Sequence, residues 1–175
     1  LGPWLLTREL LPRLKASSDA RVVLVSSGGM YTQRLSLDDI EWRRRPYDGV
    51  AAYAQTKRMQ VVMAQLPAED ADFGGIAVSA MHPGWADTPA VRTSLPRFWQ
   101  AMQGRLRTPA QGADTVIWLA SSAAARGSTG QFWFDRAPRS PHLLPWTRES
   151  AAERAALRAF CERQVAQRPR RKRAA

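Results

Sequence analysis

Two short apolar runs in this chain each end in a polar turn, and together they limit the folds that the chain can form. Residues 22 to 25, "VVLV", stand between Arg21 and the turn "SSGG". Residues 76 to 81, "IAVSAM", form a second run that is stopped by Pro83 and Gly84. Short apolar runs bounded by charge and glycine are typical of strands buried on both faces. We therefore expect both runs to be strands of a sheet with helices on each side.

Helices are predicted around and between these strands. The leucines of "LGPWLLTRELLPRLK" recur at helical spacing and predict a first helix that ends near Ser17. A second helix is expected over residues 50 to 66. The last two helices open with capping boxes, in which a hydroxyl residue is followed three positions later by Gln or Glu. The capping residues are Thr108 with Gln111, and Ser150 with Glu153, and the last helix is expected to end near Gln167.

The remaining segments complete an alternating pattern. "GQFWFD", residues 130 to 135, predicts a third strand, and residues 36 to 42, "SLDDIEW", predict a short helical piece within a basic loop. Residues 85 to 107 lack clean periodicity and are interpreted as a flap with short helices. Alternating helices and strands favour parallel strands joined by right-handed crossovers. The predicted fold class is therefore α/β, with a Rossmann-like doubly wound parallel sheet of about three strands and flanking helices.

Length and composition fit one domain. The chain has 175 residues, of which 45% are hydrophobic and 23% charged, which is ordinary for a folded protein. Its net charge of +11 favours acidic partners, such as phosphorylated cofactors, nucleic acid or anionic lipid. Part of that charge lies in the end of the chain, "RPRRKRAA". We predict one partial domain over residues 1–167 and a basic disordered tail over residues 168–175.

Cysteine and histidine usage restricts the chemistry further. Cys161 is the single cysteine, so no internal disulfide can form, and a reducing, intracellular and cytoplasmic setting is expected. His82, His142 and Cys161 are too few and too scattered to predict a metal site. No apolar run is long enough to span a bilayer. The chain begins at Leu1, which favours a fragment or a processed form.

Polar residues that could bind a ligand or take part in catalysis follow the two predicted strands. Ligands of parallel sheets bind outside the carboxyl ends of the strands, which is where "SSGG" and "HPGWADT" fall. Tyr53 and Lys57 are four residues apart and share one face of the predicted helix. Proton transfer to or from a carbonyl oxygen is difficult for a phenol whose pKa is near 10, and a cation one turn away lowers that pKa. Lys57 can therefore prepare Tyr53 for acid/base work.

Three pieces in order, Ser26-Ser27, Tyr53-x-x-x-Lys57 and Pro83-Gly84-x-x-x-Thr88, resemble the short-chain dehydrogenase/reductase family. The resemblance covers nearly the whole chain. It implies an NAD(P)-dependent oxidoreductase that acts on a carbonyl or alcohol, with Tyr53, Lys57 and Ser27 as catalytic residues. The resemblance also implies that the cofactor is bound by Tyr53, Lys57, Pro83, Gly84 and Thr88.

The resemblance also shows what the chain lacks. Family members begin with a strand and a Gly-rich turn that holds the cofactor pyrophosphate, and no such turn occurs here. The residue that chooses between NAD and NADP is missing as well. We therefore expect the carboxyl-terminal half of the fold, inactive alone, with the edge of its first strand open to pairing or aggregation.

The sequence indicates a general class of substrate and one kind of partner. Trp85, Phe98, Trp99 and Met102 in the flap indicate an apolar carbonyl or alcohol substrate, unless these side chains only pack the flap onto the sheet. The family likeness implies a homo-oligomer formed through residues 3 to 16 and 50 to 66.

Plainer interpretations stay open beside these. Tyr53 and Lys57 can be an exposed helical pair, and Ser27 can belong to a polar turn. His82 is interpreted as a packing residue and Asp87 as a turn or cap residue. The alternative function is a non-catalytic interaction module, or truncated isoform, that binds nucleic acid or acidic lipid through its basic tail.

Overall fold

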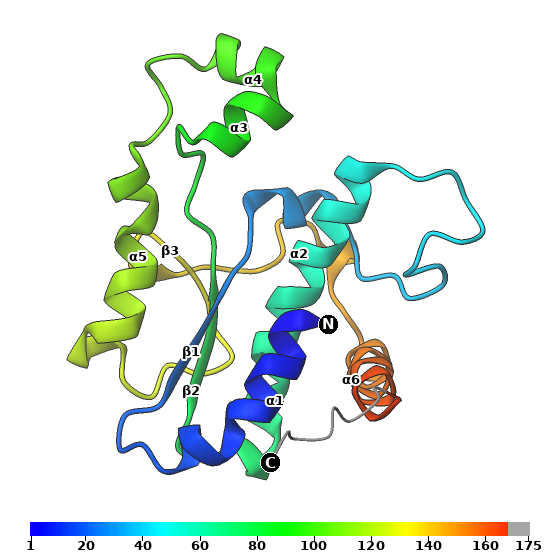
Figure 1. Ribbon diagram of the computed structural model, residues 1–175, viewed down its shortest axis with the longest axis vertical. Coiled ribbons are helices and arrows are strands. Elements are labelled where there is room, and N and C mark those ends of the chain that lie inside the picture. Colours follow the sequence, from blue (N-terminus) through cyan, green and yellow to red (C-terminus); the bar gives the residue numbers. More distant parts are fainter. Residues whose placement is uncertain (168–175) are drawn as a thin grey trace, which may run out of the picture.

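The computed structural model describes residues 1–167 and shows a central sheet between helices (Figure 1). The helices are α1 (Gly2–Lys15), α2 (Gly49–Gln65), α3 (Pro89–Ser94), α4 (Pro96–Ala101), α5 (Pro109–Ser121) and α6 (Ala151–Ala166). The strands are β1 (Arg21–Val25), β2 (Ala77–Met81), β3 (Phe132–Phe134) and β4 (Ala137–Pro138). Short 3-10 helices are η1 (Gly28–Thr32), η2 (Leu66–Glu69), η3 (Ala71–Phe73), η4 (Ala123–Ala125) and η5 (Pro145–Thr147).

The sheet has the order β1-β2-β3-β4, and its first three strands are parallel. β1 and β2 are paired from Arg21 opposite Ala77 to Val25 opposite Met81. β4 adds an antiparallel edge beside β3, which the sequence pattern did not predict. Two residues, one of them Pro138, carry no periodicity that could mark a strand. The parallel α/β prediction is confirmed.

Helices cover both faces of the sheet (Figure 1). α5 lies on one face, where Leu119 packs with Met81 and Trp133. α1 and α2 lie on the other face, where Leu11 and Val61 join the buried strand residues. α6 packs outside α1 and α2 through a further apolar cluster. That cluster consists of Trp4, Leu35, Met59, Val62, Met63, Leu66, Leu157 and Cys161.

Both capping boxes form as expected. Thr108 accepts a hydrogen bond from the backbone N–H of Gln111, and the Gln111 side chain accepts one from the Thr108 N–H. Ser150 and Glu153 make the same reciprocal pair at the start of α6. The helix bounds inferred from these residues are therefore confirmed.

β1 departs from the expectation of full burial. Although its sequence is as apolar as that of β2, its residues are only partly buried, and Val25 is 41% exposed. β1 is an edge strand, because β2 is its only neighbour among the described residues. The apolar sequence thus fits a central strand, whereas the position in this chain is peripheral.

The prediction of a short helix at residues 36 to 42 is wrong. This segment forms a turn, in which the Asp39 carboxylate accepts the backbone N–H groups of Arg43 and Arg44 at 2.8 and 3.1 Å. An aspartate that binds nearby backbone N–H groups competes with helix formation.

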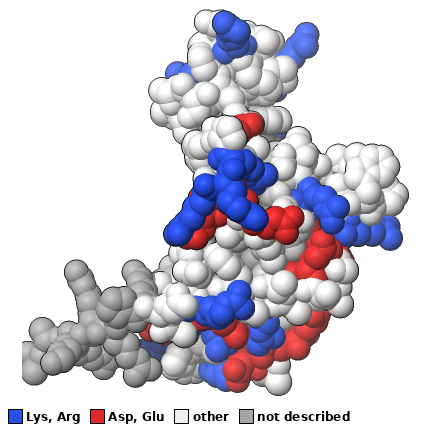
Figure 2. Space-filling model, turned by 90° about the vertical axis from the view of Figure 1, so that its right-hand side faces the viewer, with Lys and Arg blue, Asp and Glu red and all other residues white. Residues whose placement is uncertain are grey.

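Charge on the described part of the chain is distributed in separate patches. On the side that Figure 2 shows, Lys and Arg surfaces are interrupted by Asp and Glu surfaces. Several basic side chains are paired with acidic ones, including Arg43 with Glu41 and Arg45 with Asp39. The predicted basic tail, residues 168–175, lies outside the described residues. Within residues 1–167, no helix is long and apolar enough to cross a membrane.

Candidate active site

The carboxyl ends of β1 and β2 lead directly into the candidate site. After β1, Ser26 is buried and its hydroxyl donates to the backbone oxygen of Lys57 at 2.8 Å. Ser27 follows as the N-cap of η1, and its hydroxyl accepts the Gly29 N–H at 3.3 Å. The two serines therefore have different tasks. Ser26 fixes β1 against the helix that carries the lysine, while Ser27 stands in the turn beyond the strand.

Tyr53 and Lys57 lie one turn apart on α2, near the end of β1. The Lys57 ammonium donates to the backbone oxygen of Val25 at 3.0 Å and lies 5.5 Å from the centroid of the Tyr53 ring. Tyr53 is 51% exposed, so its ring is open to a ligand. Burial lowers the pKa of the Lys57 ammonium. Lys57 uses one of its three N–H donors on Val25, which leaves two for other partners.

α2 begins close to this pair because Asp48 caps it. The Asp48 carboxylate accepts the N–H groups of Val50 and Ala51 at 2.9 and 3.1 Å. A capped start satisfies backbone donors that have no partner within the helix. Tyr53 thus lies in the second turn of a well-defined helix.

The turn after β2 brings Pro83 and Gly84 to the same end of the sheet. Gly84 has a φ of 75°, in the left-handed region. A Cβ placed on Gly84 would lie 2.7 Å from Nε of Arg107, so the close approach also requires glycine. Thr88 caps α3 by accepting the Val91 N–H at 3.3 Å. Its hydroxyl is therefore engaged within the flap.

His82 is the last residue before this turn, and it packs as the sequence analysis expected. Its ring stacks on Phe134 at a centroid distance of 4.1 Å and an interplanar angle of 4°. Burial lowers the pKa of His82, and the nearby Arg107 guanidinium lowers it further.

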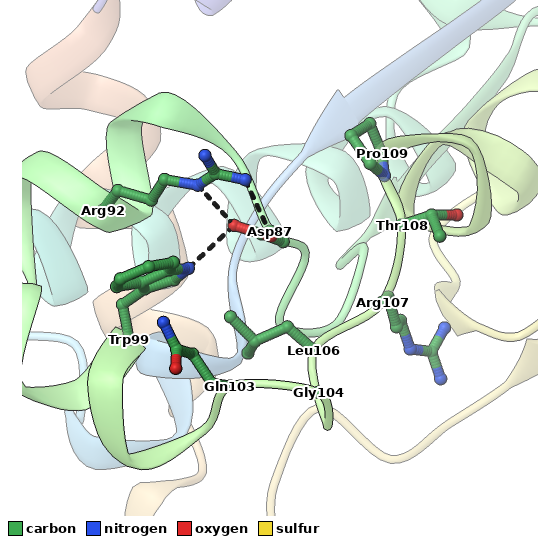
Figure 3. A pocket seen from close by; sticks show the side chains of 9 residues that line it. All are labelled: Asp87, Arg92, Trp99, Gln103, Gly104, Leu106, Arg107, Thr108 and Pro109. Atoms are coloured by element: carbon green, nitrogen blue, oxygen red, sulfur yellow. Dashed lines mark hydrogen bonds and ion pairs between the residues drawn. The ribbon is translucent and has the colours of Figure 1, made fainter.

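The flap is organised around Asp87 (Figure 3). The Asp87 carboxylate accepts hydrogen bonds from Arg92 at 2.7 and 2.8 Å and from the Trp99 indole at 2.9 Å. The hydrogen bond from Arg92 is the main cause that lowers the pKa of Asp87. Asp87 was expected to be a turn or cap residue, and in the structure it joins α3 to α4. A cavity of about 290 Å³ opens beside it, lined also by Gln103, Leu106 and Arg107.

The flap aromatics fall into two groups. Trp99 lies in the Asp87 cluster, with the Arg92 guanidinium 5.4 Å from its ring centroid. Trp85 and Phe98 contact each other at a centroid distance of 4.4 Å, and Trp85 is exposed. Trp85 and Phe98 are therefore better placed than Trp99 to meet an apolar ligand.

A buried ionic cluster behind the site was missed from the sequence. Arg58, next to Lys57, is 1% exposed and pairs with Glu149, whose side chain is 4% exposed. Arg58 also contacts His142 and donates to the backbone oxygen of Thr147 at 2.8 Å. The cluster fastens the segment after β4 to α2. A lone arginine before the apolar run "MQVVMA" was the available signal, since it must find a partner when that run is buried.

No metal site accompanies these groups in the described part of the chain. Residues 1–167 contain no cluster of three His, Cys, Asp or Glu side chains that could hold an ion. His82 lies at the turn after β2, whereas His142 belongs to the Arg58 cluster and Cys161 is buried in α6.

The chain is similar in sequence to several known proteins. No family model matches the chain. The chain is 50% identical over 144 residues to dehydrogenase/reductase SDR family member 12 of Homo sapiens, covering 82% of this chain and 45% of that protein. It is 33% identical to a probable oxidoreductase of Streptomyces antibioticus, over 77% of this chain and 49% of the relative. It is 29% identical to retinol dehydrogenase 13 of Homo sapiens, over 81% of this chain and 45% of that protein.

A solved structure agrees with the fold. An uncharacterized protein from Mycobacterium Paratuberculosis superposes with a TM-score of 0.67 at 26% identity, covering 94% of this chain and 56% of that one. The parallel strands and the helices on both faces define a Rossmann-like α/β fold. The chain belongs to the short-chain dehydrogenase/reductase family. It spans about half the length of the curated relatives that it matches.

Proposed function

We propose that the protein is an NAD(P)-dependent oxidoreductase of a carbonyl or alcohol, in which Tyr53 is the general acid and base. The observation that carries this proposal is the placement of Lys57, whose ammonium lies 5.5 Å from the Tyr53 ring centroid and bonds to the end of β1. In the proposal, the nearby ammonium offsets the negative charge that develops on the phenol oxygen during proton transfer. A half-exposed tyrosine beside it can exchange a proton with a bound ligand.

The residues of this chain fit one end of a nicotinamide cofactor. Lys57 retains two N–H donors for the hydroxyl groups of a ribose, and the Pro83-Gly84 turn offers backbone without a side chain. The Gly-rich turn for the pyrophosphate is not part of this sequence. We propose that the chain supplies the catalytic half of the site and does not bind cofactor productively by itself.

In this proposal each residue has one task. Hydride transfer at the substrate carbon is the chemistry that a nicotinamide cofactor would supply when bound. Tyr53 gives a proton to the carbonyl oxygen during reduction and takes it back from the alcohol during oxidation. The Ser27 hydroxyl holds the same oxygen beside Tyr53. Trp85 and Phe98 receive an apolar part of the substrate, which favours a lipid-like or retinoid-like carbonyl.

The interaction-module alternative depends on the basic tail, which lies outside the described residues. Several basic groups in residues 1–167 are paired with acidic ones.

The test compares this chain with a form extended upstream through a Gly-rich turn. NADH and NADPH are titrated by tryptophan fluorescence, and turnover is measured with decanal and with the polar glyceraldehyde. We expect binding only by the extended form and faster turnover of decanal. Tyr53→Phe should spare cofactor binding and lower turnover by about 10²–10⁴-fold, because the proton donor is lost.

Tyr47→Phe is the matched control, since Tyr47 is an exposed tyrosine on the loop before α2. It should leave both binding and turnover unchanged. Turnover by Tyr53→Phe at the rate of the unmodified protein would contradict the role of Tyr53, and absence of cofactor binding in both forms would contradict the oxidoreductase.

A further inference from the structure

We propose that His82 is a positioning residue that holds the Ser27-Gly28 and Pro83-Gly84 turns in place, and that cofactor binding therefore depends on the protonation of His82. The second part of this inference rests on the proposed function. The first part concerns only the geometry of the two turns.

The Gly84 turn is held by the histidine ring. The backbone N–H of Gly84 donates to Nδ1 of His82 at 3.2 Å. Because Nδ1 accepts this bond, the neutral ring carries its proton on Nε2. The bond links a residue to the N–H two positions later, as an asparagine or aspartate side chain does in an Asx turn. It fixes the partly buried glycine whose φ is 75°.

The same ring supports the turn that contains Ser27. A Cβ placed on Gly28 would lie 3.7 Å from Nδ1 and 3.8 Å from Cε1 of His82. Gly28, the first residue of η1, therefore lies near the histidine ring, with room for no more than a small side chain between them. The N–H of His82 itself donates to the backbone oxygen of Trp133 at 3.1 Å, which fixes the backbone of His82 to β3. One side chain thus links the ends of β1 and β2.

Aromatic rings fix the plane of the imidazole. Phe134 stacks on it at 4.1 Å between centroids, and Phe132 lies at 5.6 Å with an interplanar angle of 15°. Tyr31 of η1 contacts it edge-on at 6.4 Å. These contacts fix the plane of the ring, and within that plane Nδ1 lies at the edge that faces the Gly84 N–H.

The charged and titratable neighbours of His82 favour its neutral form. The Arg107 guanidinium packs over Phe134 at 4.5 Å from the ring centroid and lies against Gly84. Asp135 has the opposite effect on His82, but it is itself ion-paired with Arg107. Tyr31, whose pKa is raised by burial, adds no charge at neutral pH. Burial and Arg107 together lower the pKa of His82 below its ordinary value.

Protonation would remove the support of the turn. A proton on Nδ1 would face the Gly84 N–H, so two donors would oppose each other, and the new charge would lie near Arg107. The Gly84 bond is therefore present above the pKa of His82 in the folded protein and is lost as the pH falls through it. Because binding and protonation are linked, a cofactor that requires the ordered turn must lower that pKa further.

The first experiment follows the two turns in this chain without cofactor. His82 and His142 are the two histidines of the sequence, so their ring signals in NMR spectra can be separated with His142→Gln. Glycine labelled with ¹⁵N gives the Gly84 amide, which Gly84→Ala assigns. We expect the Gly84 amide to shift with the same midpoint as the His82 ring, below pH 6.5. A Gly84 amide that ignores the His82 titration would overturn the inference.

Two variants separate the hydrogen bond from the stacking. His82→Asn can still accept the Gly84 N–H but does not titrate, whereas His82→Phe keeps a stacked ring and loses the acceptor. In the extended form, His82→Asn should bind NADH or NADPH as the unmodified protein does at neutral pH, with no weakening at lower pH. His82→Phe should bind about five- to tenfold more weakly at all pH values.

Equal loss of binding in both variants would overturn the positioning role, since the acceptor would then be irrelevant. If no form binds either cofactor, the proposed function fails and the proposed dependence of binding on His82 fails with it. The coupling between the His82 ring and the Gly84 amide is measured without cofactor, so it decides the geometric part independently.

Discussion

At the scale of single residues, the site is built from backbone positions that tolerate little change. Gly84 combines a left-handed φ with direct contact to Arg107, and Ser26 uses its hydroxyl on the backbone of Lys57. The residue type at such a position depends on the space around it and on its backbone conformation, as well as on the chemistry of its side chain.

Gly84→Ala should destabilise the protein more than an ordinary glycine substitution. Gly104 has the same φ of 75° but nothing within 4 Å of its Cβ position, so Gly104→Ala isolates the cost of the left-handed backbone. We expect about 1–2 kcal/mol for Gly104→Ala and about 1 kcal/mol more for Gly84→Ala, because Arg107 must move. Urea unfolding followed by tryptophan fluorescence measures both, and equal losses would show that the contact with Arg107 has no energetic weight.

The candidate residues were readable from the sequence because chemistry fixes their types. Tyr53, Lys57 and Ser27 were selected through their resemblance to the motifs of a known family, and the structure places all three near the carboxyl end of β1. Arg58 and Arg107 were not readable in this way. Their partners, Glu149 and Asp135, lie far along the chain, and such long-range pairs leave no local pattern.

At the scale of elements, α2 has one exposed side that faces the candidate site and one buried side that fixes the helix. Its exposed edge carries Tyr53, while its buried edge carries Arg58 and the ion pair with Glu149. Burial lowers the pKa of the neighbouring His142, and Arg58 adds to the effect. A helix fixed in this way cannot rotate to move Lys57 without breaking a buried charge pair.

Arg58→Met should lower the free energy of unfolding by about 3–5 kcal/mol, because the buried Glu149 loses its permanently charged partner and keeps only His142. The double variant Arg58→Met with Glu149→Gln should recover part of that loss. Arg34→Met is the control, since the Arg34–Glu153 pair is exposed and should contribute under about 1 kcal/mol. Thermal unfolding of the variants provides the comparison. A loss no larger than that of the control would show that the buried pair does not stabilise α2.

The boundaries of the elements were predictable where a cap or a breaker marks them. Thr108 and Ser150 started their helices as expected. Asp39 was misleading, because its side chain satisfies the backbone as a turn does and so replaces the helix that the surrounding residues favour. β4 depends on pairing with β3, which local sequence does not encode.

At the scale of the whole molecule, β1 lies at the edge of the sheet that residues 1–167 form, although its sequence is apolar. Backbone groups on an unpaired apolar edge are available to a second chain. The chain spans about half the length of its curated relatives, and the apolar sequence of β1 is that of a strand with neighbours on both sides.

We expect this chain to self-associate through β1, and Val25→Glu should reduce the associated fraction several-fold. Leu143→Glu makes a comparable change on an exposed apolar residue outside the sheet and should have little effect. Sedimentation velocity over a concentration series measures the difference. Equal reduction by both substitutions would assign the association to general surface hydrophobicity and not to the edge.

The two ends of the flap lie side by side. Ala86 forms a β-bridge with Arg107, the Asp87 N–H donates to the Arg107 oxygen at 2.8 Å, and the Arg107 N–H donates to the Trp85 oxygen at 2.9 Å. Because its two ends are joined in this way, the segment between Asp87 and Arg107 forms a separate loop outside the sheet. Loop length has only a weak effect on closure free energy. Under the proposed function, substrate range can therefore diverge by replacement of this insert alone, while Tyr53 and Lys57 on α2 and the turns beneath them stay as they are.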